Sequence, residues 1–206
     1  MYWYHYIALA SSGIFLANFA YHLIKLIRLG KPYDYAPGAG KIVPAIWYSF
    51  AGAMNPLKKE SAFLHLPSYI AGIIYHLGSF LSILLFILNW FINLSFGLLS
   101  GILAILLIIS VCCGIGILIK RIININLKNL SNPDDYLSNI LVTSFQLLTA
   151  LTLVMDTFIP VYYIISSLLL LYFPFGKLKH AIYFFAARYH LGFFYGWRGV
   201  WPPQQL

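Results

Sequence analysis

Histidine is the residue in this chain best suited to bind a metal or to move a proton, and the sequence contains six of them. His76 lies in YIAGIIYHLGSFLSILLFIL, a stretch without any charged residue. An imidazole in hydrocarbon is costly unless it is partnered, so a histidine at this position indicates a function. His180 stands out as well. It is the last residue of the sequence FPFGKLKH, which follows a long aliphatic run.

Small residues accompany both histidines. Gly72 lies four residues before His76, and Ser79 follows His76 by three. Gly176 likewise lies four residues before His180. On a helix these small residues share a face with the histidine. Two such helices leave room for a flat macrocycle between them, and imidazole is an axial ligand of haem iron. The pattern indicates a haem site, but it also fits histidines that only hydrogen-bond between membrane helices, where glycine is common.

The elements that must position these residues are membrane helices. The chain has 206 residues, of which 61% are hydrophobic and 9% are charged, whereas about 25% charged residues is usual in soluble domains. A helix needs roughly 20 apolar residues to cross a bilayer. We therefore expect one all-α membrane domain over residues 1–206, a bundle of five transmembrane helices. The expected spans are residues 6–27, 68–92, 96–119, 136–156 and 158–176, with the last helix continuing past Lys177.

The connections between the spans carry further signals. Residues 42–54, IVPAIWYSFAGAM, read as an interfacial segment with Trp47 and Tyr48 at the headgroups. The loop over residues 120–135 ends in Asp134 and Asp135, which suit the N-terminal cap of the fourth span. The adjacent cysteines at 112 and 113 read as packing residues.

Charge predicts the orientation of the bundle. With five spans, all 13 lysines and arginines fall on one side of the membrane. By the positive-inside rule that side is the cytoplasm, so the N-terminus is outside and the segment 177–206 is cytoplasmic. The expected location is the inner, cytoplasmic membrane. The formal net charge of +8 then reflects topology and anionic lipid, and it requires no nucleic acid.

The two histidine motifs resemble a known family. YHLGSFLSILLF around His76 and FPFGKLKH before and at His180 resemble the haem-bearing spans of the respiratory nitrate reductase gamma subunit. They are also similar to the membrane cytochromes b associated with heterodisulfide reductase and with sulfite reduction. The resemblance extends over all five spans by length and orientation. It implies that His76 and His180 are the axial ligands of a haem b near the cytoplasmic side.

The resemblance also implies a function. Proteins of this family relay electrons between the quinone and quinol pool and an iron–sulfur or molybdoenzyme partner on the cytoplasmic face. The chain would then be the electron-transfer membrane subunit of a respiratory oxidoreductase complex. The competing reading is a non-redox protein, a small transporter or scaffold subunit with structural histidines, in which Asp156 and Asn89 would matter more. Asp156 itself reads as a loop residue.

The chain departs from the family at a second haem. The family carries the ligands of an outer haem at positions that correspond to about ten residues after His76 and eighteen before His180. Those positions hold Phe86 and Tyr162 here, so one haem is expected. A second haem between His65 and His190 is the alternative, although Pro67 interrupts the helix between His65 and the first motif.

Two lysines precede the second histidine. Lys177 and Lys179 mark the cytoplasmic end of the fifth span, and either could also neutralise a haem propionate. Pro174 removes one backbone donor and can kink the helix, which would aim His180 inward. The aromatic and basic segment after His180 fits either anchoring at lipid headgroups or docking of a cytoplasmic partner.

Overall fold

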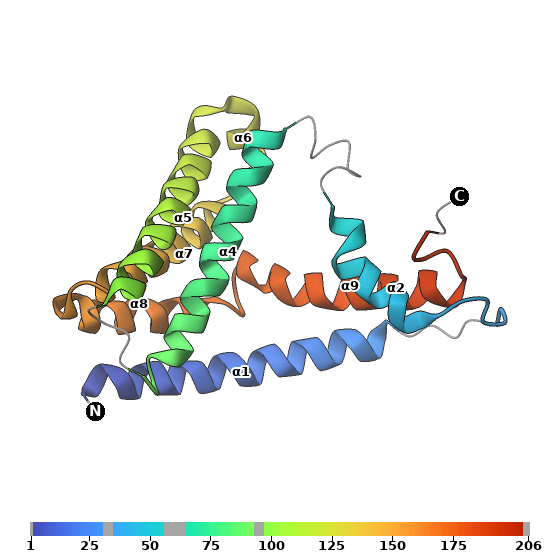
Figure 1. The fold of residues 1–206 in the computed structure, drawn as a ribbon, viewed down its shortest axis with the longest axis horizontal. Helices are drawn as coiled ribbons and strands as arrows, with labels where there is room; N and C mark the ends of the chain where they lie inside the picture. The colour runs from blue at the N-terminus through green and yellow to red at the C-terminus, as the bar shows by residue number, and fades with distance from the viewer. Residues whose placement is uncertain (1, 31–34, 56–64, 93–96, 204–206) are drawn as a thin grey trace. The chain divides into compact units, whose positions relative to one another are not determined.

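The computed structural model describes residues 2–30, 35–55, 65–92 and 97–203. All the regular elements in these ranges are helices, which confirms the predicted all-α class (Figure 1). The chain forms two compact units. Unit 1 is Met1–Phe15 with Leu66–Leu178, and unit 2 is Leu16–His65 with Lys179–Leu206. The single domain over 1–206 stays a prediction.

Unit 1 contains a bundle in which α4 packs on α5, α5 on α7, and α7 on α8. Its elements are the start of α1 (Trp3–Leu29), α4 (Leu66–Leu88), α5 (Leu98–Ile123), α6 (Ile125–Asn129), α7 (Pro133–Thr152), the 3-10 turn η3 (Asp156–Phe158), α8 (Ile159–Tyr172) and most of η4 (Lys177–Lys179). α4 starts immediately before Pro67, as proline is tolerated in a first helical turn. His65 therefore lies outside the helix.

Three of the described helices, α1, α4 and α5, are long and apolar enough to cross a membrane. The pair Asp156–Tyr172 and Lys177–Trp197 adds a fourth candidate, either as a broken span or as a re-entrant loop. By length and composition these helices are consistent with the predicted multi-pass membrane protein. α7 is 20 residues long but is not among the candidate spans. The fifth span and the orientation of the termini stay predictions.

The last predicted span is interrupted where a continuous helix was expected. α8 ends at Tyr172, and the chain turns through residues 173–176 before η4 and α9. The Tyr172 carbonyl accepts hydrogen bonds from the backbone N–H groups of Phe175, at 3.0 Å, and Gly176, at 3.1 Å. Pro174 lacks an N–H and its ring crowds the preceding turn, so the α-helical ladder ends here. The predicted kink is thus a complete break.

The start of α7 confirms the predicted cap region. Asn132 is the N-cap, and its side-chain oxygen accepts a hydrogen bond from the Asp135 N–H at 3.1 Å. The Asp135 carboxylate accepts one from the Asn132 N–H at 3.0 Å in return. Pro133 occupies the first turn, where its missing donor costs nothing. This reciprocal pair is a capping box built from asparagine and aspartate.

Unit 2 is built on two helices in close contact, α2 (Ile42–Phe50) and α9 (His180–Trp197). A Cβ on Gly192 would lie 2.5 Å from Ile46 Cα, and one on Gly196 would lie 2.7 Å from Ala45 Cβ. The two glycines are four residues apart, so one glycine face of α9 permits this approach. α2 forms most of the predicted segment 42–54, and the 3-10 turn η1 (Gly52–Met54) forms its end. Trp47 on α2 is 72% exposed, and the interfacial position of the segment stays a prediction.

Candidate functional site

His76 lies on the exposed side of α4. Its exposed neighbours on the helix are apolar, among them Ile73, Leu77 and Phe80. A Cβ built on Gly72 meets no atom of the described residues within 4 Å. The helix surface one turn before His76 is therefore bare, as the sequence predicted.

Ser79 lies on the side of α4 that faces the bundle, whereas His76 is exposed. Its hydroxyl donates to the Tyr75 carbonyl at 2.9 Å and accepts a hydrogen bond from Gln146 Nε2 on α7 at 2.8 Å. The serine that the spacing placed beside His76 thus contacts the interior of the bundle. Its role beside a haem stays a prediction.

His180 is the first residue of α9 and is exposed. Gly176, one turn earlier, is buried, and a Cβ there would lie 2.4 Å from Cε1 of Tyr172. The ring of Tyr172 therefore fills the space beside Gly176, which the spacing predicted to be open. His76 belongs to unit 1 and His180 to unit 2, and their pairing on one haem stays a prediction.

Lys177 is engaged by the two aspartates at the start of α7. Its ammonium group donates to Asp135, and its backbone N–H donates to Asp134 Oδ2 at 2.6 Å. Arg121, at the end of α5, places Nη1 3.3 Å from Asp135 Oδ1. Together these contacts fasten the segment after α8 to α5 and α7. Lys179 is the N-cap of α9. The propionate role of either lysine stays a prediction.

The surroundings of Asp135 change its acidity. The carboxylate is 6% exposed. Burial acts to raise the pKa of Asp135, but the hydrogen bonds from Lys177 and Asn132, with the positive charges of Arg121 and Lys177, outweigh it. The pKa of Asp135 therefore lies below its ordinary value, and the group remains ionised under mildly acidic conditions.

A polar network at the centre of unit 1 was missed from the sequence. Gln146 on α7 is 0% exposed. Its Oε1 accepts from the Ser110 hydroxyl at 2.7 Å, and its Nε2 donates to the Tyr75 carbonyl at 3.1 Å. Gly78 makes room for it, because a Cβ there would lie 2.0 Å from Ser110 Oγ. One amide thus links α4, α5 and α7.

A second node lies one turn away. The Tyr75 hydroxyl donates to the Asn139 carbonyl at 3.1 Å and lies 3.0 Å from Thr143 Oγ1. The Asn139 amide donates to the carbonyl of Gly114 at 3.3 Å. The signal for this network was the recurrence of polar residues on α7 at three- and four-residue spacing. Those residues are Asp135, Ser138, Asn139, Thr143, Gln146, Thr149 and Thr152.

Phe86 and Tyr162, at the positions of the family's outer haem ligands, contact each other. Their ring centroids are 6.2 Å apart. Tyr162 is 1% exposed and stacks on Phe145 at 6.0 Å. Tyr163 and Ala8 belong to the same core cluster. Aromatic packing fills this part of the bundle.

The histidine of the alternative second haem has a protein contact. His190 Nε2 lies 3.3 Å from the Leu26 carbonyl oxygen near the end of α1. A Cβ on Gly30 would lie 2.4 Å from the same nitrogen, so the ring packs directly on that backbone. This arrangement favours a structural role for His190, and the second haem stays a prediction.

Among the described residues, no three His, Cys, Asp or Glu side chains gather as a metal site. A haem needs only two axial ligands from the protein, because the porphyrin supplies the others. In comparisons with protein family models, curated proteins and solved structures, the chain gave no match. The family resemblance therefore rests on the two histidine motifs and stays a prediction.

Proposed function

We propose that the chain is a haem b-containing membrane subunit that relays electrons between the quinone pool and an iron–sulfur or molybdoenzyme partner on the cytoplasmic face. The observation that carries the proposal is the bare surface at Gly72, one turn from the exposed His76. A flat macrocycle can approach a helix closely where a glycine leaves it uncovered. The residues of α4 thus fit the group.

The chain's own contribution is to bind and orient. His76 and His180 would hold the iron, and haem supplies reversible one-electron chemistry when bound. At the second motif, the ring of Tyr172 covers Gly176 and would form part of the wall beside the macrocycle. The Asp134, Asp135 and Lys177 contacts hold the chain immediately before His180 to the bundle.

The aromatic contact between Phe86 and Tyr162 supports a content of one haem. Imidazole is absent from both positions, and the two rings pack on each other in the core. A second macrocycle there would have to displace this packing, and protein interiors tolerate such additions poorly.

A non-redox transporter or scaffold subunit is the second candidate. The buried Gln146 network favours it, because buried polar side chains in a membrane bundle serve either helix assembly or a pathway. Each described bond of the network ends on a neighbouring helix or on its own, which is the pattern of assembly. The network is therefore compatible with the redox proposal as well.

The deciding experiment is an optical spectrum of the purified full chain, before and after dithionite, followed by a pyridine haemochrome assay. We expect a b-type difference spectrum and about one haem per chain, since no CxxCH motif is present for covalent attachment. A value near two would support the His65 and His190 site. Fully assembled protein without haem would refute the redox proposal and leave the transporter or scaffold.

A further inference from the structure

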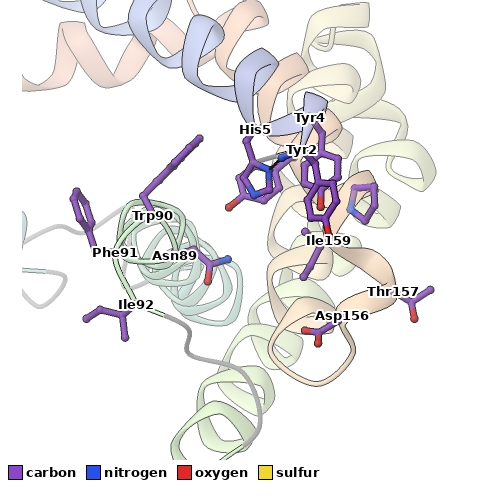
Figure 2. A pocket seen from close by; sticks show the side chains of 12 residues that line it. Tyr2, Tyr4, His5, Asn89, Trp90, Phe91, Ile92, Asp156, Thr157 and Ile159 are labelled. Carbon is purple, nitrogen blue, oxygen red and sulfur yellow. Dashed lines mark hydrogen bonds between the residues drawn. The ribbon is translucent and has the colours of Figure 1, made fainter.

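Unit 1 contains a cavity of about 620 Å³ at the end of the bundle that includes the N-terminus of α1. Figure 2 shows its labelled residues in three groups. Tyr2, Tyr4 and His5 come from the start of the chain. The second group, residues 89–92, follows the last turn of α4, and the third, with Asp156, lies at η3 and the start of α8.

Aromatic rings form much of the cavity wall. Tyr4 stacks on Tyr163 with an interplanar angle of 20° and a centroid distance of 5.6 Å. The Trp90 ring stands at 68° to Tyr163 and at 73° to His5, with centroids 5.7 and 5.9 Å away. The indole therefore makes a wall nearly perpendicular to the stacked rings. Such a corner presents the electron-rich faces of aromatic rings in more than one direction.

Asp156 supplies the charge of the cavity. It is exposed and is the only carboxylate among the lining residues that the structure describes, and none of these is a lysine or arginine. His5 Nδ1 accepts a hydrogen bond from the Tyr2 backbone N–H at 3.1 Å. The described lining residues thus offer one carboxylate to a ligand, in a chain whose formal net charge is +8.

We propose that this cavity binds an organic cation with a quaternary ammonium group, through the aromatic corner and the Asp156 carboxylate. Tryptophan is the side chain that attracts cations most strongly through its ring face, and tyrosine follows. A methylated ammonium has no N–H to satisfy, so an apolar wall with one carboxylate suits it better than it suits a primary amine. The haem proposal gives no role to Asp156 or Trp90.

The cavity is separate from the proposed haem ligand on α4. Asn89 follows His76 by thirteen residues, which corresponds to roughly 20 Å along a helix. Loss of haem should therefore leave cation binding intact. Because of this, the His76→Ala protein serves as a test that the two sites are independent.

The test uses the full chain in a maltoside detergent free of choline lipids. Binding of radiolabelled choline is measured by equilibrium dialysis, with 3,3-dimethylbutan-1-ol as competitor, because a carbon replaces the nitrogen in this neutral isostere. We expect saturable choline binding that the isostere does not displace. Equal displacement by the isostere would show that shape alone is recognised and would overturn the proposal, as would absence of saturable binding.

Substitutions in the cavity wall test whether choline binds at this site. Asp156→Asn keeps the shape and removes the charge, and it should weaken choline binding by about tenfold or more. Trp90→Leu should weaken it similarly, whereas Asp156→Glu and the exposed Trp47→Leu in α2 should retain it. Unchanged binding in Asp156→Asn would refute the site even if Trp90→Leu fails to fold.

The ammonium group could belong to a free solute or to a phospholipid headgroup. Native mass spectrometry of the protein released from mixed phosphatidylcholine and phosphatidylglycerol nanodiscs separates the two sources. Retention of phosphatidylcholine by the parent chain, and its loss in Asp156→Asn, identifies the headgroup. Choline binding in dialysis without lipid retention identifies a solute. Retention of both lipids equally in parent and variant, without choline binding, would overturn the proposal.

Discussion

Small and polar residues have different surroundings on the two faces of α4. The inward face carries Gly78 and Ser79, which contact Ser110 and Gln146 on the neighbouring helices. The outward face carries the exposed His76, with bare helix surface at Gly72. Small and polar residues on the first face join the bundle together. On the second face the same kinds of residue leave surface uncovered, which is the condition for binding a cofactor.

The largest effect should come from removing the outward histidine. His76→Ala deletes a proposed axial ligand and should reduce haem to below about a tenth of the parent content. The haemochrome assay on monodisperse protein measures this, and His180→Ala should behave the same way. His22→Ala in α1 is the matched control and should keep its haem. If His76→Ala keeps full haem, the ligand is another histidine.

A bulky residue on the outward face should act without touching iron. Gly72→Leu places a branched side chain where nothing lies within 4 Å, so the described structure accommodates it. It would occupy the space proposed for the macrocycle and should lower haem content severalfold. Gly101→Leu on α5 also enters unfilled space and provides the matched control. Equal haem contents in the two variants would place the macrocycle elsewhere.

Alanine at the two glycines of α4 contrasts the faces directly. A Cβ at Gly78 would lie 2.0 Å from Ser110 Oγ, so Gly78→Ala should destabilise unit 1 by about 1–3 kcal/mol. Gly72→Ala meets open space and should stabilise the helix by up to about 1 kcal/mol. Titration with sodium dodecyl sulfate, followed by circular dichroism, measures both. Equal stabilities would mean that α5 does not approach α4 this closely.

Composition and spacing were sufficient to predict some of these features. The all-helical class, the cap region that includes Asp134 and Asp135, and the bare surface at Gly72 each follow from local patterns. The hydrophobic length of residues 158–176 predicted a continuous span, but Pro174 within the turn after Tyr172 ended the helix. Local propensity also did not predict the short 3-10 turn η4, which lies between this break and α9.

The Gln146 network was beyond the reach of spacing alone. Polar residues recur along α7, but the sequence does not show which helix faces them. The contacts of α4 with α5 depend on two glycines. Gly78 makes room for Ser110, and Gly114 makes room for Tyr75. Ser79 was assigned to the face of His76 for the same reason: an offset of three residues places two side chains near each other but does not decide which neighbour each one contacts.

The smallest effect concerns acid, and it separates the ion pairs of Asp135 at the start of α7 from the neutral Gln146 network. The pKa of Asp135 is lower in the folded chain than in the unfolded chain. Its contribution to stability is therefore fully present above the unfolded pKa of about 3.9 and is lost as the pH falls through the folded value. Lys177 and Arg121 are partly exposed, so solvent screening limits the loss to about 1 kcal/mol.

Asp135→Asn tests this acid dependence. The variant should lose stability at pH 7 and should show a smaller decrease than the parent chain between about pH 5 and pH 3. The Gln146 network contains no carboxylate, so Gln146→Leu should lower stability without changing that decrease. Detergent-denaturation midpoints at several pH values measure each slope. Parallel slopes for Asp135→Asn and the parent would show that the ion pairs with Lys177 and Arg121 do not govern the acid response, and would assign it to other carboxylates.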